Sequence, residues 1–403
     1  MNILVLTSSI KEPDDIDNST TNVVLYFAKS WVESGHRVVL IHNESKFPYC
    51  FYKLPRFVYK ILKKKSNTVI PSVSSRKVLF REEDGVSIAR FPIFKIVPHS
   101  RFFKYQYLKQ FKRIIDYLNN LKFVPDVVTG HWIEPQLVLV NKLSDHFSSK
   151  SGIVFHSEIP NGFPKEYFRI LGKMSCVFFR NKHTLEKTLD VYENEEFTKK
   201  RTAICYSGIP EDYTSQMKQR SFNRDIFTIC YAGRLVDYKK IDSIIEALVL
   251  SFPKKDFCFH IVGDGPSKGN LLDICKNYDI ERNVIFHGAL QRKETKKIME
   301  SCDCFAMISI NEVFGLVYLE AMSCGCITIA SKDGGLDGII NDGFNGFLCE
   351  QGNHQDLVRI LNLIVSMSDN EIEVMQKNAF DTVKNYTDIE VSRRYLKELE
   401  GEL

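Results

Sequence analysis

The chain has 403 residues, of which 44% are hydrophobic and 26% are charged, and its net charge at pH 7 is +4. This composition is typical of a folded globular protein and excludes gross disorder, and the length allows two or three domains with cores of their own. So small a net charge does not by itself indicate a nucleic-acid partner. No run of about eighteen apolar residues and no signal-peptide pattern is present, so we expect a cytoplasmic protein.

The first half begins with a strand, a helix and a second strand. Residues 2–7 form an apolar run, residues 22–34 have the spacing of an amphipathic helix that ends at Gly35, and residues 37–41 are again apolar. Further strand-like runs follow at 125–132, 152–157, 176–179 and 202–206. A strand, helix and strand joined by short returns predict a parallel sheet.

Two segments of this half, 46–65 and 101–113, interleave basic and aromatic residues. Such a mixture suits an anionic bilayer surface, and it also suits single-stranded nucleic acid. A solvated face with aromatic packing beneath it is a third interpretation, and the residues alone leave all three open.

His131 and His156 each follow an apolar run of the first half. Strand ends are where ligands gather in open α/β sheets, so either histidine is a candidate contact to a ligand. A satisfied structural histidine is the alternative, and it is the stronger interpretation for His131.

The second half alternates strictly between strands and helices. Apolar runs occur at 227–232, 257–262, 284–287, 304–308 and 327–330, with helical runs between them at 241–250, 270–277, 295–301 and 315–323. This alternation predicts a doubly wound parallel sheet, and amphipathic helices at 355–367, 371–385 and 388–400 complete the chain. No Gly-x-Gly-x-x-Gly pattern opens the sheet, which argues against a dehydrogenase.

Charged residues gather in two loops of this half. Arg234 and Lys239 follow the first strand, where a guanidinium fork and a lysine suit a diphosphate. Glu312 and Glu320 flank Gly315, where the unpaired amides of a helix start suit an anion and the missing side chain lets a ligand approach. Ordinary surface charges are the alternative, but together these residues indicate a ligand that carries phosphate and hydroxyl groups.

The stretch Glu312-Val-Phe-Gly-Leu-Val-Tyr-Leu-Glu320 resembles the Glu-x7-Glu signature of the retaining glycosyltransferases of family four, glycosyl transferases group 1, of the bacterial surface-polysaccharide type. The resemblance implies the GT-B fold, an α/β architecture of two Rossmann-like doubly wound parallel-sheet domains that face a central cleft. It implies an acceptor-binding domain at 1–207, a donor-binding domain at 208–386, and a final helix at 387–403 that packs back on the first domain.

The resemblance also implies roles for individual residues. Glu312 and His156 lie at the donor sugar, Glu320 binds the ribose hydroxyls, and Arg234 and Lys239 clamp the diphosphate. The remaining donor-binding positions are backbone or turn positions that contact the donor or shape its pocket: Gly263, Leu290, Phe314, Gly315 and Leu316. Among the positions that depart from the family pattern, Asn18, Ser19 and Lys240 stand where glycines are usual, and Gly338 stands where a glutamate is common.

The implied activity is retaining transfer of a hexosyl group from a nucleotide diphosphate sugar, with UDP expected as the nucleotide, to a hydroxyl of a glycan or lipid-linked acceptor. The nucleotide sugar is a co-substrate, and no separate cofactor or metal is expected. Asp15-Ile16-Asp17 matches the Asp-x-Asp motif of metal-dependent enzymes. Because Arg234 and Lys239 are expected to offset the charge of the diphosphate, we attribute this match to chance.

Because 46–65 and 101–113 lie in the acceptor half, we expect them to contact the anionic inner face of the cell membrane, and we expect no nucleic acid. Two other functions remain open. One is a GT-B sugar-nucleotide epimerase, and the other is a non-enzymatic basic and aromatic module that binds membrane or RNA.

Eleven cysteines are present, and Cys302-Asp-Cys304 and Cys324-Gly-Cys326 have a single intervening residue. Common zinc sites space their cysteines by two residues or more. Since free cysteine behaves as a small buried hydrophobe, we expect core positions rather than metal ligands or disulfides.

Overall fold

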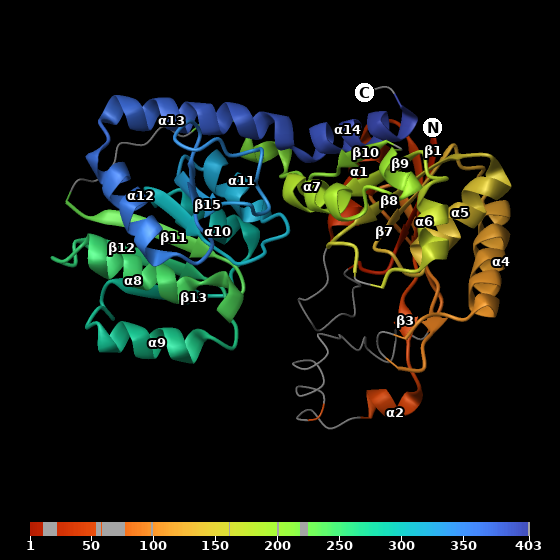
Figure 1. Cartoon of the computed structure of the whole chain (residues 1–403), viewed down its shortest axis with the longest axis horizontal. Coiled ribbons are helices and arrows are strands. Elements are labelled where there is room, and N and C mark those ends of the chain that lie inside the picture. Colours follow the sequence, from red (N-terminus) through yellow and green to blue (C-terminus); the bar gives the residue numbers. More distant parts are fainter. Residues whose placement is uncertain are drawn as a thin grey trace. The chain divides into compact units, whose positions relative to one another are not determined.

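A computed structural model describes residues 1–10, 22–53, 58, 77–97, 100–160, 162–199, 201–217 and 225–401 (Figure 1). Its contacts divide the chain into two compact units. The first comprises Met1–Arg180, Thr184–Cys205 and Ser392–Leu403, and the second comprises Asn181–His183 and Tyr206–Val391. The main division therefore falls between Cys205 and Tyr206, two residues before the boundary that the sequence indicates.

The first unit contains an eight-stranded sheet in the order β10-β9-β8-β7-β1-β2-β5-β4. All its neighbouring strands are parallel except β4, which pairs antiparallel with β5. The elements are β1 (Asn2–Thr7), α1 (Val23–Glu33), β2 (Arg37–His42), β3 (Ser45–Lys46), α2 (Tyr49–Tyr52), β4 (Leu79–Glu83), β5 (Val86–Arg90), β6 (Ile93–Phe94), α4 (Lys104–Asn120), β7 (Val127–His131), α5 (Gln136–Phe147), β8 (Lys150–Phe155), α6 (Lys165–Leu171), β9 (Cys176–Phe179), α7 (Lys182–Val191), η2 (Glu196–Lys199) and β10 (Thr202–Ile204). The hairpin of β4 and β5 was not expected, because its outer strand alternates between half-buried and exposed residues and lacks an apolar run.

The C-terminal helix α14 (Asp388–Glu400) contributes to the core of the first unit. The Nε1 of Trp31 in α1 donates a hydrogen bond to the carbonyl oxygen of Ser392 at 3.0 Å. The ring of Tyr395 packs edge-on against Phe27, with centroids 5.4 Å apart, and against Phe178 of β9 at 4.6 Å. Burial of these aromatic rings is what holds the end of the chain on this sheet.

The second unit contains a six-stranded parallel sheet in the order β13-β12-β11-β14-β15-β16. Its elements are η3 (Glu211–Tyr213), β11 (Phe227–Ala232), η4 (Asp237–Lys239), α8 (Ile241–Ser251), β12 (Phe257–Val262), α9 (Lys268–Asn277), β13 (Val284–Gly288), α10 (Arg292–Met299), β14 (Cys304–Met307), α11 (Leu316–Ser323), β15 (Ile327–Ser331), β16 (Phe347–Cys349), α12 (His354–Ser366), α13 (Asp369–Val383) and η5 (Lys384–Tyr386). Five of the six strands were expected, and β16 has only three residues, too few for a recognisable pattern.

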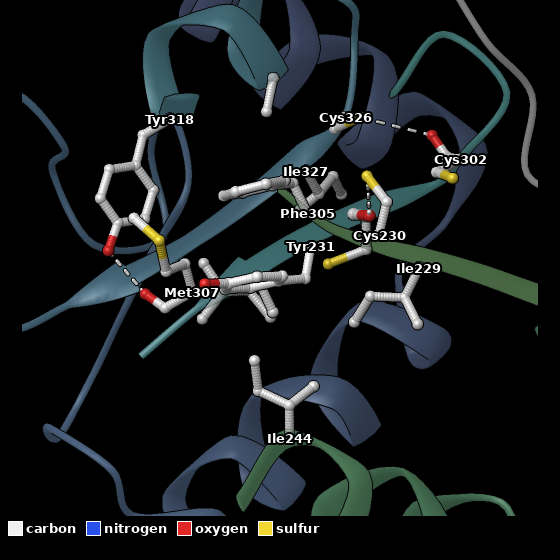
Figure 2. Packing of buried hydrophobic residues seen from close by; sticks show 14 of the residues in the cluster. Ile229, Cys230, Tyr231, Ile244, Cys302, Phe305, Met307, Tyr318, Cys326 and Ile327 are labelled. Carbon is white, nitrogen blue, oxygen red and sulfur yellow. Dashed lines mark hydrogen bonds between the residues drawn. The ribbon is translucent and has the colours of Figure 1, made fainter. Parts of the chain in front are cut away.

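Helices cover both faces of this second sheet, with α8, α9 and α12 in one layer and α10, α11 and α13 in the other (Figure 1). The core beneath α11 contains Tyr231, Phe305 and Tyr318 (Figure 2). The hydroxyl of Tyr318 donates to the carbonyl oxygen of Met307 at 2.6 Å, which ties the first turn of α11 to the end of β14 (Figure 2). The position of this helix start is therefore fixed by the core.

All eleven cysteines are free, and nine of them are buried, as their apolar settings indicate. Cys326 donates from its sulfur to the carbonyl oxygen of Cys302 at 3.5 Å (Figure 2). Across the described residues, no helix is both long enough and apolar enough to cross a membrane.

Candidate functional site

The strand order of the second sheet reverses direction between β11 and β14. From β11 the chain proceeds to β12 and β13 on one side, whereas β14, β15 and β16 lie on the other. Loops diverge at such a point, and ligands of open α/β sheets bind in the crevice that this leaves at the carboxyl ends of the strands. The loops that follow β11 and β14 carry the cations and acids that the sequence singles out.

Lys239 and Glu312 form an ion pair at this edge. Lys239 is the last residue of η4, Glu312 lies between β14 and α11, and the glutamate Oε2 is within hydrogen-bond distance of the lysine Nζ. The two side chains are 12% and 13% exposed, and Nζ also lies 3.6 Å from the Sδ of Met307. Since both charges have little contact with water, they interact more strongly than surface ions do. Lys239, which is predicted to contact the diphosphate, and Glu312, which is predicted to contact the sugar, are thus neighbours.

Arg234 lies between β11 and η4 and is exposed. Its carbonyl oxygen accepts a hydrogen bond from the Tyr231 hydroxyl at 3.0 Å, which fixes its backbone. In the described part of the chain its guanidinium has no ion-pair or hydrogen-bond partner, so all its donors remain for a ligand.

Lys240 stands where the family usually has glycine, and its backbone has the positive φ of 53° that glycine adopts most readily. A Cβ built on Gly352 would lie 3.0 Å from the Cγ of Lys240, so this side chain lies against Gly352. The geometry therefore selects Lys239, rather than Lys240, as the lysine beside Glu312.

Gly263 allows two strand-end loops to touch through their backbones. Its φ is 139°, and a Cβ built on it would lie 1.8 Å from the carbonyl oxygen of Gly233. The amide of Gly233 donates to the carbonyl oxygen of Val262 at 2.9 Å, and the amide of Gly263 donates to the carbonyl oxygen of Gly288 at 2.7 Å. No side chain fits between these loops, so Gly263 shapes the edge of the site through its backbone alone.

The start of α11 offers unpaired amides beside Glu312. Gly315 is its N-cap with φ of 74°, and a Cβ there would lie 2.5 Å from the ring of Tyr318. Phe314 is buried and Leu316 is half-buried, so what each offers a ligand is its backbone. A Cβ on Gly335 would lie 2.3 Å from the Cα of Phe314, which places the 334–335 loop directly against this backbone. A helix start held in this way is suited to an anion.

Glu320, in the second turn of α11, pairs with Arg292, the first residue of α10. The Nη2 of Arg292 lies 2.6 Å from the Oε1 of Glu320, and the carboxylate side chain is 12% exposed. Burial raises the pKa of Glu320, and the charge of Arg292 together with its hydrogen bond lowers it. The guanidinium carbon of Arg292 also lies 5.3 Å from the ring centroid of Tyr213 in η3.

The sequence did not indicate Arg292 or Tyr213. It placed the helix start at residue 295, whereas α10 begins at Arg292 because Gln291 and Glu294 form a capping box. The Gln-x-x-Glu pattern was the signal available for this. Tyr213 is the last residue of the short element η3, and no local pattern ties it to α10.

Two expected positions lie at the margin of the site. Leu290 follows β13 and is half-buried against the core of the second unit, at the loop where a base is expected. Gly338 is exposed with φ of 82°, a conformation that the glutamate usual in the family adopts only with strain.

His131 and His156 lie at the ends of β7 and β8 in the first unit. The Nδ1 of His131 and the Nε2 of His156 are 3.1 Å apart and share a hydrogen bond. The ring of His156 stacks on Trp132 with centroids 4.0 Å apart. Burial lowers the pKa of both histidines well below 6.5, and the nearby Arg180 guanidinium lowers both further. The pair is therefore neutral, and His156 is a hydrogen-bonding group rather than a cation.

We expect the first unit to lose stability as the pH falls below 6.5. Each unfolded histidine takes up a proton there while its folded counterpart does not, which costs about 1.4 kcal/mol per pH unit for each histidine. Both tryptophans, Trp31 and Trp132, lie in the first unit, so tryptophan fluorescence in urea follows this unit alone. His131→Asn should reduce the dependence of the free energy of unfolding on pH between 6.5 and 5.5 by the share of one histidine, and His156 and His36, whose pKa burial also lowers, should account for the rest. An unchanged dependence would contradict the burial of a neutral His131.

Some expected features fall outside the described residues. These are Asp15-Ile16-Asp17, Asn18-Ser19, and most of the 46–65 segment after Lys53. Among the residues that are described, no three His, Cys, Asp or Glu side chains come together as a metal-ligand group.

Residues 212–382 match the family model described as glycosyl transferases group 1. The chain is 29% identical over 252 residues to an uncharacterized glycosyltransferase of Methanocaldococcus jannaschii, a match that covers 59% of this chain and 65% of that protein. It is 26% identical over 232 residues to the Campylobacter jejuni N-acetylgalactosamine-N,N'-diacetylbacillosaminyl-diphospho-undecaprenol 4-alpha-N-acetylgalactosaminyltransferase, with 57% of this chain and 61% of that enzyme covered. The matched stretch thus spans less than two thirds of either relative.

Among solved structures, Anabaena HepE in complex with UDP and glucose is similar with a TM-score of 0.65 at 17% identity, and all of both chains is covered. The part of the chain that matches this family model, residues 212–382, contains the Glu-x7-Glu stretch. The structural similarity confirms the GT-B fold class, with a Rossmann-like parallel sheet in each unit.

Proposed function

We propose that this protein is a retaining glycosyltransferase that moves a sugar from a nucleotide diphosphate sugar, UDP-linked, to a hydroxyl of a glycan or lipid-linked acceptor without a metal ion. The observation that carries this proposal is the Lys239–Glu312 pair beside the start of α11, at the point where the strand order reverses. Similarity to HepE, whose structure holds UDP and glucose, and to an enzyme named for a diphospho-undecaprenol acceptor supports the donor and acceptor classes.

Cleavage of the donor builds negative charge on the leaving diphosphate. Arg234 and the amides at Gly315 and Leu316 stabilise that charge, because fixed donors in a water-poor site need no reorganisation during the reaction. Lys239 exchanges Glu312 for the diphosphate when the donor binds, since a dianion competes well for a lysine held by one carboxylate.

The exchange frees Glu312 for the sugar. Its carboxylate accepts hydrogen bonds from sugar hydroxyls and opposes the positive charge that develops on the ring. Glu320 binds the ribose at the other end of the diphosphate. Retention follows from attack on the face that the diphosphate leaves, where a phosphate oxygen takes the proton of the acceptor hydroxyl.

The experiment that tests this function is a thermal-shift screen of nucleotide sugars, followed by product analysis with and without chelator. We expect one nucleotide sugar to stabilise the protein, and glycosylated product to form in an extract that contains candidate acceptors. Release of a free epimerised sugar without acceptor would favour an epimerase instead. The absence of any shift across the panel would favour a binding module, and activity that chelator abolishes would overturn the metal-free scheme.

We further propose that α4 rests on an anionic membrane surface. Its outer side carries the exposed Lys104 and Lys109 beside Tyr105 and Leu108, which are 62% and 49% exposed. Next to it lies a hollow of about 140 Å³ whose lining includes Lys46, Lys109 and Arg113 and no acidic residue. Lysines with exposed apolar neighbours suit anionic headgroups and the acyl region beneath them.

We expect the Lys104→Gln, Lys109→Gln variant to bind vesicles that contain phosphatidylglycerol about 30-fold more weakly, since each lysine near an anionic surface contributes about 1 kcal/mol. The matched control is Lys254→Gln, Lys276→Gln, which removes the same charge from the exposed surface of the second unit. Vesicle sedimentation measures both. Equal losses in the two variants would show that net charge, rather than α4, determines binding.

A further inference from the structure

Arg292 occupies a position that is unfavourable for a cation in isolation. It is the first residue of α10, whose capping box is formed by Gln291 and Glu294. Aligned peptide dipoles leave positive charge at a helix start, so a cation there is disfavoured. A partner elsewhere must compensate for this, and that partner is Glu320 of α11, 2.6 Å away.

The guanidinium of Arg292 is held from a second side by Tyr213. The ring of Tyr213 is buried, and its centroid lies 5.3 Å from the guanidinium carbon of Arg292 and 4.1 Å from the Nζ of Lys296. A guanidinium in contact with both an aromatic face and a carboxylate loses little further freedom when a ligand binds. Three elements, η3, α10 and α11, therefore fix this one ion pair.

The ion pair uses one carboxylate oxygen of Glu320. Oε1 faces Arg292, and within the described residues Oε2 has no other partner. A carboxylate with one oxygen held by an arginine presents the other in a defined direction, and its charge strengthens any hydrogen bond that it accepts. Without the arginine, a largely buried carboxylate would lose both its orientation and its compensating charge.

We propose that Arg292 is a positioning residue of the donor site: it holds the Glu320 carboxylate in place so that the free oxygen accepts hydrogen bonds from the ribose hydroxyls. This rests on the proposed function, in which Glu320 binds the ribose. Arg292 and Glu320 then act together, and together they select a nucleotide that carries both ribose hydroxyls over one that lacks them.

A direct test compares UDP with 2',3'-dideoxyuridine diphosphate, which differs only in the two hydroxyls, by calorimetry. Since a hydrogen bond to a charged group contributes about 1.5–3 kcal/mol, we expect the unsubstituted protein to prefer UDP by roughly 10- to 100-fold. Arg292→Gln should reduce this preference to within about threefold while it leaves affinity for the dideoxy nucleotide unchanged. Constant dideoxy affinity shows that the site remains folded.

Three further variants sharpen the comparison. Arg292→Lys keeps the charge and should keep part of the preference, whereas Lys293→Gln removes a charge from the exposed neighbouring position and should keep all of it. Glu320→Gln should reduce the preference for UDP as much as Arg292→Gln does. The double variant should lose no more of this preference than either single variant, because both changes disrupt the same ion pair.

The dependence on pH gives a second readout. In Arg292→Gln the guanidinium no longer opposes the effect of burial on Glu320, so the pKa of Glu320 rises. Because a protonated Glu320 accepts weaker hydrogen bonds, any remaining preference for UDP should decrease from pH 8 to pH 6. The other groups around the pair are Tyr213, Lys296 and Cys324, and burial raises the pKa of Tyr213 and of Cys324 away from this range. The unsubstituted protein should keep its preference across the range.

The outcomes separate this proposal from the proposed function. If the unsubstituted protein prefers UDP and Arg292→Gln keeps that full preference, the positioning role is wrong and the glycosyltransferase function stands. If the unsubstituted protein binds UDP and the dideoxy nucleotide equally, the ribose role of Glu320 is wrong and the positioning role falls with it. If it binds neither, and no other nucleoside diphosphate, the proposed function falls as well.

Discussion

Lys239→Ala is expected to lower kcat/KM for sugar transfer by about 10²- to 10³-fold, the usual loss when one fixed donor to a developing anion is removed. Lys239 is the cation of this site that already touches Glu312, and its Nζ lies against the end of β14. Its removal deprives the leaving diphosphate of a stabilising positive charge. It also leaves the mostly buried Glu312 carboxylate without its partner. Initial rates with the nucleotide sugar selected by thermal shift measure the effect.

The matched control for this variant is Lys240→Gly. It removes a lysine one position away, and it places glycine where the backbone already has a positive φ. We expect rates within about threefold of the unsubstituted protein, because the Lys240 side chain lies against Gly352. Equal losses in both variants would mean that overall charge near the site, rather than the contact of Lys239, carries the effect. A Lys239→Ala enzyme with its full rate would refute the phosphate role.

Gly263→Ala is expected to destabilise the second unit by at least about 3 kcal/mol, a loss of the size that severe steric overlap produces. The new Cβ would lie 1.8 Å from the carbonyl oxygen of Gly233, and the φ of 139° is itself strained for alanine. Because the obstacle is backbone, relief requires the loops after β11 and β12 to separate. For a unit of this size the midpoint of thermal unfolding should fall by roughly 6–12 °C.

Gly269→Ala is the control for this change. Gly269 lies in α9, and a Cβ there would have no atom within 4 Å. Helix propensity alone then predicts a gain of up to about 1 kcal/mol. Because both tryptophans lie in the first unit, calorimetry is the suitable measurement. A Gly263→Ala protein that unfolds at the temperature of the unsubstituted one would show that the two loops can separate at little cost.

Local signals accounted for much of the second unit. The expected strands at 227–232 and 257–262 are β11 and β12 with the same bounds, because a buried parallel strand appears in sequence as a short continuous apolar run between loops. Short or half-exposed elements carry no such signal. For this reason β16 and the β4–β5 hairpin were missed, and α10 was placed three residues too late.

The residues of the candidate site also fall into those that local patterns indicate and those that they do not. Arg234, Lys239, Glu312 and Glu320 were found from the sequence because each lies a fixed number of residues from a glycine or a strand end, and chain spacing is a local property. The contacts of Arg292 with Glu320 and with Tyr213 join positions 28 and 79 residues apart in the chain, by subtraction of their numbers, and no local pattern specifies such pairs.

The sequence by itself determined the alternating α/β architecture, the Glu-x7-Glu stretch, and the cations and acids available to a ligand. These follow from hydrophobic periodicity and from spacing within single loops. Only the tertiary structure decided which charges meet. It paired Lys239, and not Lys240, with Glu312, it gave Glu320 the partner Arg292, and it brought His131 and His156 together as a neutral pair. The reason is physical: charge and pKa depend on distance and burial, and both are set by packing between elements that are remote in the chain.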